Sequence, residues 1–144
     1  MKKQILIFIL SIFTIHSGYS QLVNLHDFDG INGNSPIGHL TLARNVLYGL
    51  TPTGGTKEKG VLFSINLDGT NFQKLHDFDT SGTIGWPQGS LVLSGNVLYG
   101  LCGSGHAPGG DGHAGGIFSI NTDGSGYKDI IGFKEATGTS PKGS

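Results

Sequence analysis

The sequence has a single cysteine and few charges. Cys102 is the only cysteine among 144 residues, which excludes an internal disulfide. Charged residues make up 13% of the chain and the formal net charge is -1, which gives no electrostatic basis for binding nucleic acid or an anionic membrane surface. We therefore expect no nucleic-acid partner, and stability must come from sheet packing, a partner chain or bound ions.

The sequence also lacks an apolar run long enough to span a membrane. The N-terminal run Ile5 to Ile15 has 11 residues, whereas a membrane span needs about 17 to 25. Two lysines precede the run and Gly18-Tyr19-Ser20 follows it as a small-x-small cleavage site. These features predict a cleaved signal peptide at residues 1–20, with an uncleaved membrane anchor as the alternative. We expect a protein that is secreted, periplasmic or displayed on the cell surface.

Glycine, in contrast, is abundant, and the chain repeats itself. The 26 glycines suit many short strands joined by tight turns. The run NVLYGL at Asn45 to Leu50 returns unchanged 51 positions later, at Asn96 to Leu101. The run from Leu62 to Phe72 returns in similar form 55 positions later, from Ile117 to Tyr127. The second copy therefore has four extra residues between these two blocks.

A third block and a set of prolines follow the same repeat. LHDFD at Leu25 to Asp29 recurs at Leu75 to Asp79 and, in degraded form, at Ile130 to Lys134. Each of three prolines stands two residues before a glycine: Pro36, Pro87 and Pro141. A four-strand repeat of roughly 50 residues has the blade length of a kelch-type β-propeller.

Short apolar and β-branched runs separated by turn residues predict four strands in each copy. The first unit has His39 to Ala43, Val46 to Leu50, Val61 to Asn66 and Phe72 to Phe78; the second has Ser90 to Leu93, Val97 to Leu101, Ile117 to Asn121 and Tyr127 to Phe133. Asp68-Gly69 and Asp123-Gly124 supply residues for tight hairpins. One further strand, Leu22 to Phe28, is expected before the first unit.

We therefore predict an all-β fold. Residues 21–144 form a tandem β-repeat region, with units at about 39–78 and 90–133 and a truncated third start at 134–144. The expected architecture is two four-stranded antiparallel propeller-like blades plus the N-terminal strand, as part of a larger β-propeller; the alternative is a β-sandwich. Closed propellers typically need four to eight blades. Because the third repeat starts at 134–144 and is truncated, we favour a fragment of a longer protein over a homo-oligomer.

The three repeated blocks resemble the GloVer tandem repeat of bacterial exported proteins. The family pattern is Leu-Tyr-Gly-Thr-Thr, a Gly-rich stretch, Gly-x-Val-Phe-x-Ile, Asp-Gly and Leu-x-x-Phe, and the resemblance covers residues 22–144. This chain departs from it at Leu50 and Leu101, where threonine is common, and at Gly132 to Lys134. The resemblance implies many tandem copies, a propeller-like fold, export with varied C-terminal surface anchors, and no established activity.

One loop gathers metal-ligand side chains: Cys102, His106, Asp111 and His113. Thiols, imidazoles and carboxylates are the groups that bind zinc and related metals. Their spacing matches no known zinc pattern, and the equivalent loop from Thr51 to Lys59 has no cysteine, histidine or aspartate. We interpret the loop as a solvated variable loop, with a metal site as the weaker alternative, and we expect no cofactor.

A second candidate is an oxygen-rich loop that resembles a calcium-binding loop, because its side chains offer oxygen ligands: Asp27, Asp29, Asn32 and Asn34. A helix-flanked calcium loop requires a bidentate Glu at its twelfth position, and that position is Gly38. We favour acids that cap strand ends. The repeated His26 and His76 are interpreted in the same way, as hydrogen-bonding positions between units rather than catalytic residues.

Three aromatic residues are the candidate ligand contacts. Tyr48, Tyr99 and Trp86 could form a platform that stacks on sugars. For the two tyrosines, core packing with the hydroxyl satisfied at the rim is the simpler interpretation. Trp86 is expected in a loop, where the first unit has Ser35.

We expect a non-enzymatic binding or cell-surface interaction module with an unknown glycan or protein ligand. The first alternative is a fragment of a propeller-type carbohydrate-active enzyme, whose catalytic acids would be unrepeated carboxylates, chiefly Asp111, Glu58 and Glu135. The second alternative is a structural remnant with no activity alone.

Overall fold

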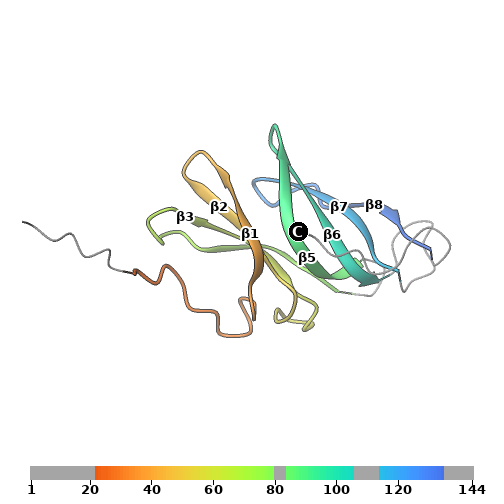
Figure 1. Cartoon of the computed structure of the whole chain (residues 1–144), viewed down its shortest axis with the longest axis horizontal. Helices are drawn as coiled ribbons and strands as arrows, with labels where there is room; N and C mark the ends of the chain where they lie inside the picture. Colours follow the sequence, from red (N-terminus) through yellow and green to blue (C-terminus); the bar gives the residue numbers. More distant parts are fainter. Residues whose placement is uncertain (1–21, 80–83, 106–113, 135–144) are drawn as a thin grey trace, which may run out of the picture.

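The computed structural model describes residues 22–79, 84–105 and 114–134, which form two four-stranded antiparallel sheets. The first sheet has the order β1 (Ile37–Ala43), β2 (Val46–Thr51), β3 (Val61–Asn66) and β4 (Gln73–Asp77). The second has the order β5 (Ile84–Ser94), β6 (Val97–Gly105), β7 (Gly116–Asn121) and β8 (Lys128–Gly132). Figure 1 shows β1 of the first sheet and β5 of the second as neighbours where the two sheets meet. Within the described ranges, no helix has the length and apolar character to cross a membrane.

The Asp-Gly turns fix the third hairpin of each sheet, as the sequence predicts. In the first sheet the backbone N–H of Thr70 donates to the Asp68 carboxylate at 3.0 Å, and Gly69 has a φ of 82°. Ser125 and Asp123 repeat this contact at 2.9 Å. The hydrogen bonds from Thr70 hold the pKa of Asp68 below its usual value. An aspartate that binds its own turn in this way sets the register of the flanking strands.

The strand predictions need two corrections. The second unit begins at Ile84 rather than Ser90, and its pairing with β6 runs from Ile84↔Gly105 to Ser94↔Val97. Trp86 therefore lies in a strand and not in a loop. Residues 22–29 form no strand, because this segment lies on the face of the first sheet, where side chains meet and backbones do not pair.

A core of apolar side chains joins the two sheets. The first sheet contributes Tyr48, Leu50 and Leu62 from β2 and β3. The second sheet contributes residues that are all nearly or fully buried: Ile84, Leu91, Leu98, Cys102, Phe118 and Ile120. Burying side chains of this size contributes about 1.5 to 3 kcal/mol each. The two sheets are therefore held together by apolar contact between their facing surfaces.

The other face of the first sheet carries a second apolar cluster. Val61, Phe63 and Ile65 of β3 form its centre. Phe28 from the N-terminal segment packs against this cluster, together with Leu47 and Phe72. The first sheet therefore has an apolar cluster on each face, one packed against the second sheet and one packed against the N-terminal segment.

Candidate functional site

The repeated histidines lie in two matching aromatic clusters. The His26 ring stacks on Phe72 with centroids 3.7 Å apart, and His76 stacks on Tyr127 at the same distance. Two residues after each histidine, Phe28 and Phe78 make edge contacts with Phe63 and Phe118, respectively. Phe72 and Tyr127 occupy equivalent positions in the two units. Each LHDFD block therefore packs on the unit that follows it in the chain.

The two histidines have different polar surroundings. The His26 Nε2 atom lies 3.1 Å from the side-chain nitrogen of Asn32, which can donate to it. Among the described residues, the buried His76 Nε2 atom has no hydrogen-bond partner. Burial lowers the pKa of His76 to about 4, although the nearby Asp77 and Asp79 act in the opposite direction. His76 is therefore neutral at physiological pH and fits a packing role.

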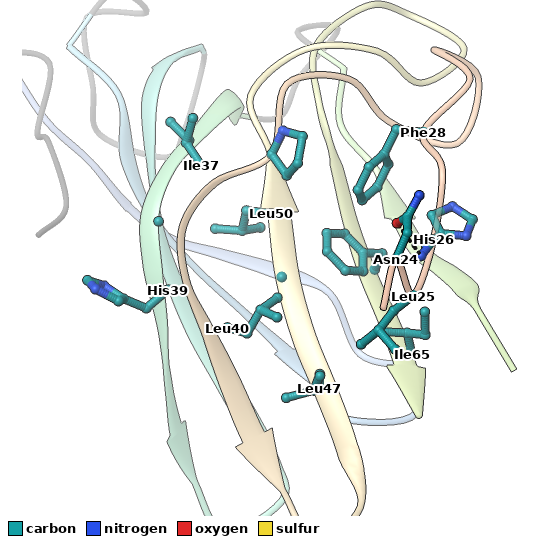
Figure 2. A pocket seen from close by; sticks show the side chains of 14 residues that line it. Asn24, Leu25, His26, Phe28, Ile37, His39, Leu40, Leu47, Leu50 and Ile65 are labelled. Carbon is teal, nitrogen blue, oxygen red and sulfur yellow. Dashed lines mark hydrogen bonds between the residues drawn. The ribbon is translucent and has the colours of Figure 1, made fainter. Parts of the chain in front are cut away.

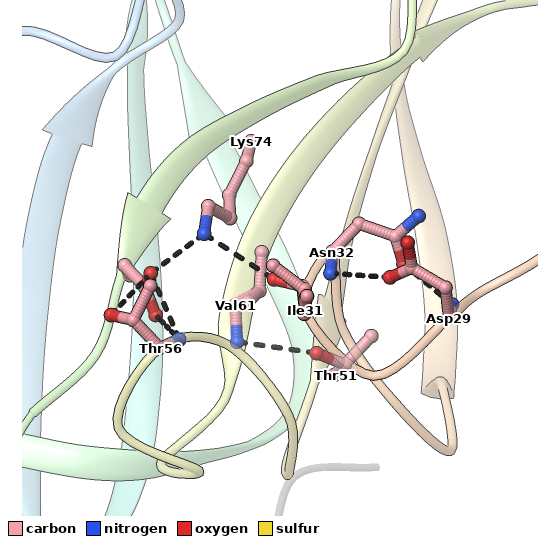
Figure 3. Close-up of polar contacts among 8 residues, drawn as sticks. Asp29, Ile31, Asn32, Thr51, Thr56, Val61 and Lys74 are labelled. Atoms are coloured by element: carbon pink, nitrogen blue, oxygen red, sulfur yellow. Dashed lines mark hydrogen bonds and ion pairs between the residues drawn. The ribbon is translucent and has the colours of Figure 1, made fainter.

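The acidic loop of the first unit uses its oxygens to hold its own shape. The Asp29 carboxylate accepts a hydrogen bond from the Asn32 backbone at 2.8 Å, and Asn32 accepts one from the Asp29 backbone at 2.9 Å (Figure 3). The Lys74 ammonium donates to the carbonyl of Ile31 at 3.3 Å. These contacts agree with the structural interpretation of the loop, because they engage the oxygens that a calcium ion would need.

Asp77 is the repeated acid that holds a neighbouring loop. Its carboxylate accepts hydrogen bonds from the backbone and hydroxyl of Thr56 and forms an ion pair with Lys74 at 2.7 Å. Burial alone would raise the pKa of Asp77, but the hydrogen bonds from Lys74 and Thr56 outweigh it and hold this pKa below its usual value. Asp77 is thus charged and structural.

The three candidate aromatic residues do not share one environment. Tyr48 is only 6% exposed, and its hydroxyl donates to the carbonyl of Thr122 in the other sheet at 3.2 Å. Tyr99 holds the equivalent position in the second unit and is 37% exposed. Trp86 is half-buried on β5, with the Lys59 ammonium 3.8 Å from its ring centroid, a cation–π contact.

Of the four candidate metal ligands, only Cys102 lies within the described residues. It is fully buried on β6, and burial raises the pKa of its thiol well above the ordinary value. His106, Asp111 and His113 lie outside the described residues, so the metal site stays a prediction. Elsewhere in the described ranges, no group of three or more His, Cys, Asp or Glu side chains is placed to hold a metal ion.

Comparison with known proteins identifies the repeat. The family model described as the Gloeobacter/Verrucomicrobia repeat matches residues 11–144. The chain belongs to this family. No curated protein and no solved structure matches it. The family assignment agrees with the resemblance of the three repeated blocks to the GloVer repeat.

Aligning the two Gloeobacter/Verrucomicrobia units shows one acid that the sequence analysis missed. Asp129 holds the position of Lys74, and it accepts a hydrogen bond from the Tyr127 hydroxyl at 2.6 Å. Partial burial raises the pKa of Asp129 even though the bond from Tyr127 acts against the rise. The exchange of lysine for aspartate at one repeat position is the sequence signal that could have found it.

A second missed contact joins β1 to β5. The Ser90 hydroxyl lies 3.3 Å from Nδ1 of His39 and accepts a hydrogen bond from the His39 backbone at 2.9 Å. These residues stand at the same position of the two units. A hydroxyl beside an imidazole is the beginning of a nucleophile–base pair, but the contact also links the two sheets, which accounts for its geometry.

Proposed function

We propose that the chain is an exported, non-enzymatic repeat protein that binds a glycan or protein ligand outside the cell or at its surface. The observation that carries this proposal is how the two units use their side chains. The repeated polar residues His26, Asp29 and Asp77 are engaged in stacking, turn formation and loop bracing. Residues that differ between the two units are not needed for these shared contacts, so they can serve in ligand recognition.

The contact surface that we propose centres on Trp86. Its counterpart in the first unit is Ser35, so the indole is not required by the repeat. The half-buried ring of Trp86 beside the Lys59 ammonium offers an apolar face and a positive charge within one contact. A sugar ring stacks on such an indole face, and an acidic sugar or peptide group pairs with the lysine.

Binding tests this proposal directly. The purified chain is screened against a panel of neutral and acidic glycans and peptides, and Trp86→Ala is expected to weaken any hit by tenfold or more. Val92→Ala serves as the matched control, because Val92 is an exposed apolar residue on the same strand. Equal losses in the two variants would remove Trp86 from the contact surface.

Export is tested separately. Mass spectrometry of the chain recovered from an exporting host should show a product that begins at Gln21. A cell-associated product that retains residues 1–20 would contradict cleavage.

The carbohydrate-active enzyme remains a second candidate because of Asp129. A carboxyl group with a raised pKa, as at Asp129, is the state that a general acid needs. If the chain is a glycosidase, Asp129→Asn abolishes turnover while Lys128→Gln, at an exposed position on the same strand, leaves it intact. Absence of hydrolysis across the same glycan panel leaves the binding proposal in place.

A further inference from the structure

The two sheets meet through different surfaces, and each surface has an unpaired equivalent elsewhere on the chain. In the first sheet, the donor surface consists of Tyr48, Leu50 and Leu62, which enter the core between the sheets. The same positions in the second sheet are Tyr99, Leu101 and Ile117. Tyr48 is 6% exposed and Tyr99 is 37% exposed, although both lie at the same point of their sheets. The second sheet therefore presents a donor surface with no neighbour among the described residues.

The surface of the second sheet that receives these residues is called the acceptor surface, and here it is the first sheet whose equivalent residues are the more exposed. Leu91 and Leu98 of the second sheet receive the donor surface and are 6% and 0% exposed. Their equivalents in the first sheet are Leu40 and Leu47. Leu40 is 51% exposed, and Leu47 is half-buried. The acceptor surface of the first sheet thus lacks the contacts that bury its counterpart.

A groove marks this vacant acceptor surface. It has a volume of about 230 Å³ and lies between β1 and the N-terminal segment, over β2 and β3. Figure 2 shows Leu40 and Leu47 lining it, with His26 and Phe28 on the opposite wall. Its lining is largely apolar, so a partner must bring apolar side chains of matching spacing.

We propose that a second copy of this chain fills the groove, docking its β6–β7 donor surface in the way that β2–β3 packs on the second sheet within one chain. Tyr99, Leu101 and Ile117 of the incoming copy would contact Leu40 and Leu47. The Tyr99 hydroxyl would donate to the carbonyl of Leu67, as Tyr48 does to the equivalent Thr122. The occupant follows from the chain itself, because its internal interface already displays this pairing.

The docked copy competes with the N-terminal segment. Within one chain, β4 and Phe78 form the outer wall of the internal interface through the His76 and Phe78 contacts. In the docked pair, β8 of the incoming copy would occupy the equivalent place. In the single chain, residues 24–28 of the receiving copy lie there. Residues 22–29 belong to no sheet, whereas β8 is paired with β7. The segment is therefore the part that moves away.

An interface of this kind joins two different surfaces, so a docked pair keeps one free donor surface on one copy and one free acceptor surface on the other. Such head-to-tail contacts close into rings or continue as filaments. Two to four copies would bring together the four to eight units of a typical closed propeller. A discrete oligomer of this size is the expected product.

The test is the mass of the full chain in solution as a function of concentration, by light scattering and sedimentation equilibrium. Leu101→Ser on the donor and Leu40→Ser on the acceptor should each weaken association at least tenfold. Leu22→Ser is the matched control, because Leu22 is 98% exposed. His26→Ala removes the stack on Phe72 and should strengthen association several-fold, since the segment then leaves more easily.

Mixing the two impaired variants gives the sharpest readout. Leu101→Ser keeps an intact acceptor and Leu40→Ser an intact donor, so an equimolar mixture should form a dimer that neither variant forms alone. Circular dichroism of each variant verifies that it is folded. The proposal is overturned if the wild type stays monomeric at millimolar concentration, if Leu22→Ser weakens association as much as Leu101→Ser, or if the mixture yields no dimer. Weaker association of His26→Ala would overturn the displacement of the segment.

Discussion

The imidazole of His76 lies flat on the ring of Tyr127, with 3.7 Å between their centroids and 7° between their planes. His76 belongs to β4 of the first sheet, and Tyr127 immediately precedes β8 of the second. The stack therefore joins the two units through the LHDFD block. It also places an imidazole where water is largely excluded, so its protonation is linked to folding.

Lowering the pH should destabilise the fold through His76. Its pKa is about 4 in the folded chain against 6.5 for the free side chain, so the unfolded state takes up the proton first. Stability is then full above about 6.5 and falls as the pH drops toward 4. Denaturant midpoints at pH 7.5 and 5 measure the slope. His76→Phe keeps an aromatic stack without a titrating group and should show a smaller decrease; an unchanged decrease would contradict the assignment.

Leu91 and Leu40 form a matched pair for testing the interface between the sheets. They hold the same repeat position but are 6% and 51% exposed. Leu91→Ala should reduce the free energy of unfolding by about 2 to 5 kcal/mol, because it leaves a cavity in the core. Leu40→Ala should cost less than about 1 kcal/mol. Urea titration of both variants at low protein concentration provides the comparison, and equal losses would show that the sheets do not pack as described.

The Tyr48 hydroxyl tests a polar contact in the same interface. It donates to the Thr122 carbonyl at 3.2 Å. Tyr48→Phe should therefore lower the free energy of unfolding by about 1 kcal/mol. Tyr99→Phe is the control and should leave the stability of the dilute chain unchanged. A larger loss in Tyr99→Phe than in Tyr48→Phe would reverse the roles of the two positions.

The Cys102 thiol should resist modification in the folded chain. Cys102 is 0% exposed, and burial raises its pKa, so little reactive thiolate is present. We expect labelling by iodoacetamide at pH 8 to be at least a hundredfold slower in native buffer than in 6 M guanidinium chloride. Rapid labelling under native conditions would show an accessible thiol and would favour the metal-binding interpretation of the loop that follows it.

The sequence allowed the strand pattern to be predicted because the signals that define it are local. Alternating apolar residues, the turn at Asp68-Gly69 and the matching run at Asn96 to Leu101 mark strands and repeats without knowledge of distant contacts. The prediction was wrong for residues 22–28, although their alternation is that of a strand. A strand also needs a partner edge, and this segment lies on a sheet face instead.

The candidate sites were harder to predict, because burial and protonation depend on neighbours that are remote in sequence. The same LHDF motif leaves His26 beside Asn32 and buries the His76 Nε2 atom without a hydrogen-bond partner among the described residues. Asp129 acquires its raised pKa from partial burial, which its sequence position alone does not reveal.

By itself, then, the sequence determined an all-β chain of two repeated units, since short-range alternation and turn residues are enough to specify each hairpin. Only the tertiary structure decided which of two equivalent residues is covered. Tyr48 and Tyr99 lie in the same NVLYGL run, yet one enters the core and the other stays at the surface. The physical reason is that burial belongs to the contact between sheets, and only the first sheet has a following neighbour among the described residues.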